Sequence, residues 1–151
     1  MLTRAGTIAL RALVELARLP GQTLSVRELA ARQGLPAPML EQVVQRLRRA
    51  GLVEARRGRL GGYRLAAQAE RLPLDRVLEA VGGLRGPARP APPAAEGSGA
   101  ASAGQRVEGQ LQQRLERLVL QELRRLTLAE LLYDQRSWEA RLDPEGGIML
   151  S

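Results

Sequence analysis

The segment 25–63 combines two helix-forming stretches with a short hairpin-forming stretch, and this order constrains the fold more than any other feature. Ser25 and Glu28 have the spacing of a capping box, which predicts a helix that Gly34 ends. A second helix is expected over 36–50, because proline is tolerated in a first turn and the apolar residues recur at helical spacing. The sequence therefore predicts a helix-turn-helix.

The residues that follow this second helix predict a wing. Leu52 to Ala55 is typical of a first strand, 58–62 of a turn and 63–65 of the returning strand. Only one acid, Glu54, lies among the seven arginines of this region, which are Arg46, Arg48, Arg49, Arg56, Arg57, Arg59 and Arg64. About six excess positive charges therefore gather on the second helix and hairpin, and phosphate is the expected partner.

The remaining sequence completes the predicted organisation. Helices are expected over 3–19, beneath the helix-turn-helix, and over 74–81. Residues 84–104 are rich in Pro, Ala, Gly and Ser, which favours a flexible linker or loop. A long helix is expected over 105–126, and Thr127 and Glu130 form a second capping box for a short helix through Leu132.

The predicted fold is mainly α with a small β-hairpin: a winged helix-turn-helix with a long C-terminal dimerisation helix. The corresponding domains are a DNA-binding domain at 1–83, the linker at 84–104, and a dimerisation helix with a C-terminal helix at 105–151. The long helix carries an apolar stripe that a lone helix cannot bury. We interpret it as a dimer seam, with an intrachain core as the alternative. The candidate dimerisation residues are Val107, Leu111, Leu115, Leu118 and Leu123.

Composition excludes several classes of function. The chain has no cysteine and no histidine, so thiolate and imidazole metal ligands, disulfides and Cys or His nucleophiles are all missing. We therefore expect neither an enzyme nor a bound metal or other cofactor. The first apolar run, 8–19, is interrupted by Arg11, Glu15 and Arg18, which argues against a signal peptide or membrane span. A cytoplasmic protein without a membrane partner is expected.

Several pieces of the chain resemble one bacterial family. They are Leu2-Thr3, Gly6, Ala9-Leu10, Ala12-Leu13, Glu28-Leu29-Ala30, Gly34, Leu40-Glu41-Gln42, Leu47-Arg48, Ala50-Gly51-Leu52-Val53, Arg57-Gly58, Gly61-Gly62-Tyr63, Leu65 and 126–131. In these residues the chain resembles the IscR/NsrR/CymR group of winged-helix transcriptional regulators, the Rrf2 class. The resemblance implies a homodimer with crossed C-terminal helices on a palindromic operator in double-stranded DNA. It also implies recognition helices in major grooves and wings in minor grooves.

The candidate DNA contacts combine the outward face of the second predicted helix with the wing. They are Pro38, Glu41, Gln42, Gln45, Arg46, Arg48, Arg49, Arg56, Arg57, Arg59 and Tyr63. Glu41 would accept a hydrogen bond from cytosine N4, or alternatively pair with Arg46 or Arg48. The arginines could also be an ordinary solvated face. Tyr63 and Trp138 are expected to pack, because a single aromatic makes no stacking platform.

The chain departs from this family in two places. Members with an iron–sulfur cluster carry cysteines where this chain has its Pro/Ala/Gly stretch, so the resemblance does not extend to cluster sensing. The wing turn has Arg59 and Leu60 where small residues or glycine are usual. The signal is left open between a small ligand, a partner protein and no signal. A non-specific architectural DNA-binding protein and a winged-helix protein-interaction module are the alternative functions.

Overall fold

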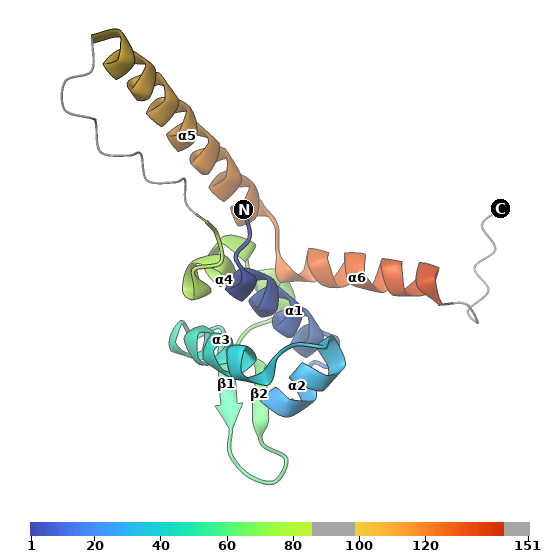
Figure 1. Cartoon of the computed structure of the whole chain (residues 1–151). Helices are drawn as coiled ribbons and strands as arrows, with labels where there is room; N and C mark the ends of the chain where they lie inside the picture. Colours follow the sequence, from blue (N-terminus) through green and yellow to red (C-terminus); the bar gives the residue numbers. More distant parts are fainter. Residues whose placement is uncertain (86–98, 144–151) are drawn as a thin grey trace, which may run out of the picture.

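The computed structural model describes residues 1–85 and 99–143. Within these ranges the chain forms six α-helices, one 3₁₀ helix and a two-stranded antiparallel sheet (Figure 1). In chain order the elements are α1 (Arg4–Arg18), α2 (Val26–Gln33), α3 (Ala37–Arg49), β1 (Val53–Arg56), β2 (Gly62–Leu65), η1 (Ala69–Arg71), α4 (Leu74–Val81), α5 (Gly99–Arg125) and α6 (Leu128–Leu142). The prediction of a mainly α fold with a small hairpin is confirmed.

Helix α1 is the central element of the core and packs against α2, α3, α4 and α6. Its apolar face is almost fully buried, as the periodicity of 3–19 predicts. The same cluster takes in Leu29 from α2, Leu40 and Leu47 from α3, and Leu128 from α6. Burial of each of these leucines stabilises the fold by about 1.5–3 kcal/mol relative to exposure. One continuous core thus fixes the helix-turn-helix on α1 and also receives the first turn of α6.

The expected capping box starts α2. The backbone N–H of Glu28 donates to the Ser25 hydroxyl over 3.1 Å, and the N–H of Ser25 donates to the Glu28 carboxylate over 2.8 Å. Gly34 ends the helix with a φ of 60°, a conformation that costs glycine little. Helix α3 follows directly and buries its apolar face, which leaves its polar face directed away from the core. The helix-turn-helix predicted from the sequence is therefore present.

The wing is a short hairpin that is fastened to the body at its base. Strand β1 pairs with β2 in antiparallel register, with Glu54 opposite Arg64. Leu24, just before α2, exchanges backbone hydrogen bonds with Tyr63 of β2 at 2.7 and 2.9 Å. A Cβ atom at Gly62 would lie 2.5 Å from the Leu24 carbonyl carbon, so only glycine allows this close approach.

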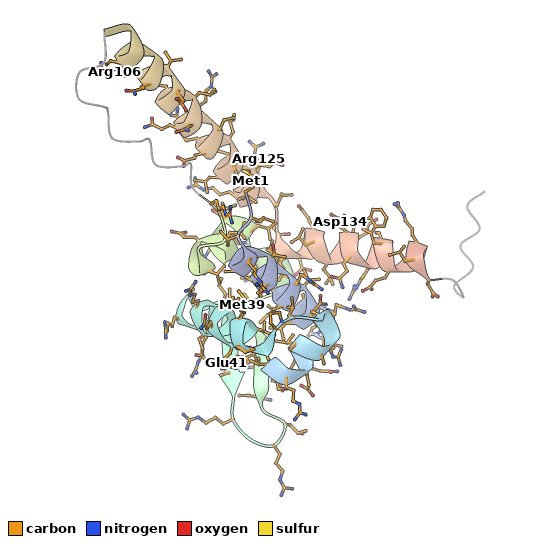
Figure 2. All side chains as sticks on the ribbon, viewed as in Figure 1. Met1, Met39, Glu41, Arg106, Arg125 and Asp134 are labelled. Carbon is orange, nitrogen blue, oxygen red and sulfur yellow. The ribbon has the colours of Figure 1, made fainter. Side chains whose placement is uncertain are left out.

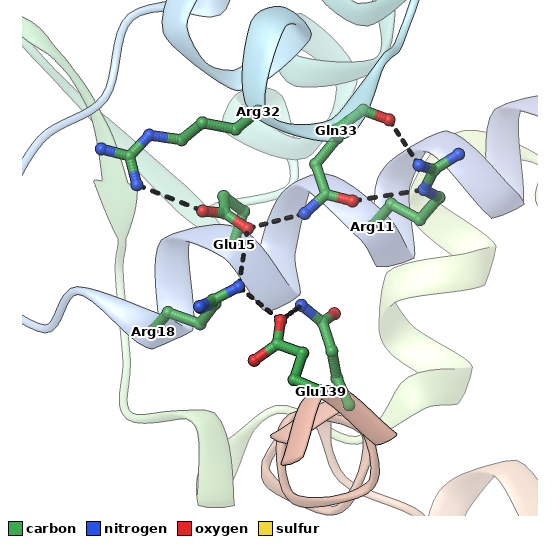
Figure 3. A network of polar contacts seen from close by, with 7 residues as sticks. Arg11, Glu15, Arg18, Arg32, Gln33 and Glu139 are labelled. Atoms are coloured by element: carbon green, nitrogen blue, oxygen red, sulfur yellow. Dashed lines mark hydrogen bonds and ion pairs between the residues drawn. The ribbon is translucent and has the colours of Figure 1, made fainter. Parts of the chain in front are cut away.

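A polar network connects α1, α2 and α6 through one buried carboxylate (Figure 3). Glu15 is 3% exposed and accepts hydrogen bonds from Gln33 at 2.6 Å and from Arg32 at 3.3 Å. Arg18 lies 3.7 Å from Glu15 and forms a 2.6 Å ion pair with Glu139 of α6. Because buried charges are costly without partners, this set of partners explains how α1 accommodates an acid on a buried position.

Helix α5 begins at Gly99 rather than near 105, so part of the segment expected as linker is helical. At the start of that expected linker, Leu84 pairs with Leu2 and the Arg85 N–H donates to the Met1 carbonyl at 2.8 Å, and 86–98 lies outside the described residues. The base of α5 contacts α4, where Arg124 Nε lies 3.3 Å from Asp75 Oδ2, and the helix extends away from the body (Figure 1). No helix in the described part of the chain is long and apolar enough to cross a membrane.

Three expectations for α6 are wrong. The Thr127 side chain makes no capping hydrogen bond; a backbone hydrogen bond of 2.9 Å from the Leu128 N–H to the Leu72 carbonyl holds the helix start instead. The helix also continues to Leu142, because its packing against α1 supports several further turns. Trp138, expected as a packing residue, is 59% exposed and lies under the guanidinium of Arg141.

Candidate nucleic-acid interface

The face of α3 that points away from the core carries the predicted contact residues. Pro38, Glu41, Gln42, Arg48 and Arg49 are all exposed. Within the described part of the chain, the side chains of Arg48 and Arg49 have neither a hydrogen-bond acceptor nor an ion-pair partner. Their guanidinium groups are therefore available to an external anion.

Gln45 joins this face to the wing. Its side-chain amide donates to the Tyr63 hydroxyl at 3.0 Å and to the Glu41 carboxylate at 3.3 Å. The Tyr63 ring packs against the core, as expected, while its hydroxyl reaches α3. Gln45 and Tyr63 thus fix the wing relative to α3.

Glu41 lies on the exposed face of α3 (Figure 2). Among the described residues it forms no ion pair, so the alternative in which it pairs with Arg46 or Arg48 is not observed. The hydrogen bond from Gln45 leaves acceptor positions on the carboxylate unoccupied. Glu41 is therefore able to accept a hydrogen bond from a molecule that approaches α3.

Arg46 differs from its neighbours. Its Nη1 donates over 3.2 Å to the carbonyl of Val81, the last residue of α4. A cation at the carboxyl end of a helix is favourable, because the unpaired carbonyls there carry partial negative charge. The structure therefore places the Arg46 guanidinium between α3 and α4, in a depression that Arg49 also lines. Its predicted contact with DNA stays a prediction.

The wing concentrates positive charge at its outer end. Arg64 pairs across the strands with Glu54 at 3.1 Å, so the only acid of the hairpin is neutralised near the body. Arg56, Arg57 and Arg59 are exposed and make no ion pair within the described ranges. Side chains reach outward from the hairpin tip (Figure 2). The charge that remains unpaired therefore lies at the end of the wing farthest from the core.

The contact between Thr23 and Leu60 was not predicted from the sequence. The Thr23 hydroxyl donates to the Leu60 carbonyl at 2.7 Å and holds the wing turn against the segment before α2. Leu60 itself is 91% exposed. Their contact depends on how the hairpin folds back on the body, and no local pattern encodes it. The departure of the turn from small residues was the only signal at Leu60.

The candidate dimerisation residues lie on α5, outside the core. Val107, Leu111, Leu115 and Leu118 are 53–66% exposed, and Leu123 is half-buried. In the described residues the stripe is therefore not part of an intrachain core. An open groove of about 600 Å³ runs beside it and is lined by Met1, Leu84, Arg85, Gln112, Leu115, Glu116, Val119 and Leu120.

The donor set does not fit an iron–sulfur cluster. Cysteine thiolates are the usual ligands of such clusters, with histidine as the main substitute, and the chain contains neither. Within 1–85 and 99–143 there is also no group of three or more acidic side chains that could hold a metal ion.

Comparison with known proteins identifies the family. Residues 2–134 match the model of the Rrf2 family, described as iron-dependent transcriptional regulators. An HTH-type regulator from Synechocystis is 36% identical over 140 residues, which cover 92% of each chain. The regulator IscR of Cereibacter sphaeroides is 45% identical over 83 residues, 53% of this chain and 54% of that protein.

Solved structures agree with the sequence comparisons. IscR of T. potens has a TM-score of 0.70 at 28% identity and covers 95% of this chain and 92% of its own. CymR of Staphylococcus aureus has a TM-score of 0.66 at 28% identity, over 86% of this chain and 96% of that one. The chain therefore belongs to the Rrf2 family of winged-helix, DNA-binding transcriptional regulators, and it is not an enzyme.

Proposed function

We propose that this regulator acts as a homodimer that binds a palindromic operator sequence-specifically and does so without an iron–sulfur cluster. The single observation that carries the proposal is the combination of free polar side chains on α3 with unpaired arginines at the wing tip. A helix that enters the major groove reads bases, and flanking guanidinium groups bind phosphates or a narrow minor groove.

Sequence specificity is supported by Glu41 and Gln42. An acid in a basic surface opposes non-specific attraction to phosphates, so its place on the exposed face of α3 favours a base contact. A carboxylate accepts from cytosine N4, and a glutamine side chain can make two hydrogen bonds to adenine. An architectural DNA-binding protein needs neither group.

Dimerisation is supported by the stripe on α5. Leu111, Leu115 and Leu118 are more than half exposed along a helix that extends from the body, and burial in a seam with a second copy would remove them from water. The neighbouring groove offers an apolar surface beside Leu115 for the partner's helix. Two α3 helices related by a two-fold axis would then read a palindrome.

Independence from an iron–sulfur cluster is supported by the ligand chemistry. With no cysteine or histidine, the chain offers no conventional ligands for an iron–sulfur cluster. The purified protein should be colourless, and its DNA affinity should be equal in anaerobic and aerated buffer. A visible absorption band with stoichiometric iron after anaerobic purification would contradict this part of the proposal.

Selection of bound sequences from a random duplex pool tests the proposed function. We expect an enriched palindrome with half-sites about 10 bp apart, or a small multiple of this distance, because each recognition helix occupies one major groove. Retention of DNA without any enriched sequence would indicate an architectural protein. Failure to retain DNA at low salt would indicate a protein-interaction module.

A further inference from the structure

We propose that Leu60 is a minor-groove wedge, which inserts between base pairs beside the operator half-site and bends the DNA there. This inference rests on the proposed function. It adds a specificity-determining residue at a position where the family resemblance assigns no role to an apolar side chain.

The exposure and position of Leu60 are the first observation. Its side chain is 91% exposed, and it occupies a central position of the turn at the wing tip. The N–H of Gly61 donates to the Gly58 carbonyl at 2.9 Å and closes this turn, so Arg59 and Leu60 project from its outer end. Turns usually carry Gly, Asn or Asp at such a position. The exposed Leu60 side chain contributes no hydrophobic burial to the stability of the free protein.

The turn holds the Leu60 backbone firmly while the side chain stays free. Thr23 donates to the Leu60 carbonyl at 2.7 Å, which ties the tip to the body. A Cβ atom at Gly61 would lie 2.5 Å from the Arg56 carbonyl oxygen, so the returning chain passes very close to the first strand. A wedge must resist the stacked bases that it separates, and a braced backbone provides that resistance.

The charges around Leu60 favour the minor groove of DNA as its partner. Arg56, Arg57 and Arg59 are exposed and have no ion-pair partner among the described residues, while Glu54 is occupied by Arg64. Narrow minor grooves attract guanidinium groups through their negative potential. An apolar tip between arginines is the combination that minor-groove proteins use to unstack a base step. A protein partner with an apolar pocket would not need this charge.

This geometry predicts sequence specificity at base pairs to which no side chain donates or accepts a hydrogen bond. Pyrimidine–purine steps unstack most easily, so a TA or CA step in the flank should be preferred. The preference should depend on Leu60 and only weakly on salt, since an apolar side chain releases no counterions from phosphate.

The test uses the full-length protein and the duplex obtained by selection, with 2-aminopurine at the flanking step. The wild-type protein and Leu60→Met should raise 2-aminopurine fluorescence several-fold at saturation and bend the duplex in a permuted-fragment assay. Leu60→Ala should lose both signals and the preference for TA over a stiff step, with its salt slope unchanged.

Arg59→Ala is the matched control. Its salt slope should fall by about one unit, because one phosphate contact is lost, while the fluorescence rise at saturation remains.

The outcomes separate the two proposals. If the wild-type protein selects no sequence, the proposed function fails. If it binds its duplex specifically but the fluorescence does not rise, or if Leu60→Ala behaves as the wild-type protein does, the wedge is wrong and the proposed function stands. Because the Leu60 side chain is exposed, an unchanged melting temperature in all variants verifies that they are folded.

Discussion

Glu41 is the only acidic residue of α3, and the structure leaves it without an ion pair in the described part of the chain. We expect Glu41→Ala to change sequence preference more than affinity. The substitution removes repulsion from phosphate, and it also removes a base contact worth about 1–3 kcal/mol of discrimination. Selection of bound sequences from random DNA with the variant measures the change in sequence preference. Glu108→Ala, an exposed acid on α5, is the control. An unchanged consensus would leave Glu41 with only its hydrogen bond from Gln45.

Glu15 provides a second prediction, about stability. Glu15→Gln should lower the free energy of unfolding by about 1–3 kcal/mol, because Arg18 and Arg32 lose their buried charged acceptor. Glu139→Gln also breaks an ion pair, but a more exposed one, and should cost less than about 1 kcal/mol. Urea unfolding of both variants measures the difference. Equal losses of unfolding free energy in the two variants would mean that burial of the Glu15 carboxylate does not strengthen its ion pairs.

Individual residues show why some contacts were predictable. The Ser25–Glu28 capping box joins residues three apart, so the sequence alone defines it. The contact from Arg46 to Val81 spans 35 positions and depends on how α4 returns to α3. The same spacing of Thr127 and Glu130 failed as a capping box, because backbone pairing with the segment before α4 fixes the start of α6 instead.

At the scale of elements, the wing carries the third prediction. Arg57→Ala should weaken binding most at sites with A-tract flanks, because these have a narrow and strongly negative minor groove. Arg64→Ala is the matched control, since Arg64 is paired with Glu54 in the same hairpin. Fluorescence anisotropy with A-tract and GC-rich flanks around one core site measures both variants. Equal losses for Arg57→Ala on the two flanks would count against insertion of the wing.

Helix α5 carries the fourth prediction. Leu115→Asp combined with Leu118→Asp places two charges in the proposed apolar seam, and burial of a polar group without a partner costs at least about 1–3 kcal/mol. We expect a monomer in analytical ultracentrifugation. Gln113→Asp, on the opposite side of α5, should remain a dimer. If the double variant stays dimeric at micromolar concentration, the seam lies elsewhere.

Periodicity predicted the elements that the core fixes, namely α1 to α4 and the hairpin, with bounds close to those observed. It predicted the ends of α5 and α6 less well. The low apolar content of 99–104 suggested a linker, although these residues continue the helix. The length of α6 was missed because its support comes from α1, far away in sequence. The exposure of most candidate contact residues on α3 and the wing was predictable, because charge and amphipathic pattern are local properties, while their contact with DNA stays a prediction.

At the scale of the whole molecule, the fold separates two surfaces. The polar face of α3 and the charged wing lie at one end, and α5 extends from the other (Figure 1). Residues 1–86 carry fifteen arginines and seven acids, whereas 87–151 carry eight arginines and nine acids. The net charge of the first part, +8, is therefore available for DNA, and the nearly neutral second part suits self-association.

The most direct test of the central claim is a salt titration of DNA binding by fluorescence anisotropy, with the selected palindrome and a scrambled duplex of equal length. We expect the palindrome to be bound at least about 10³-fold more tightly at physiological salt. For both duplexes the logarithm of affinity should fall with the logarithm of salt concentration, by about 0.9 per phosphate neutralised. Equal affinity for the two duplexes, or a flat response to salt, would contradict the account.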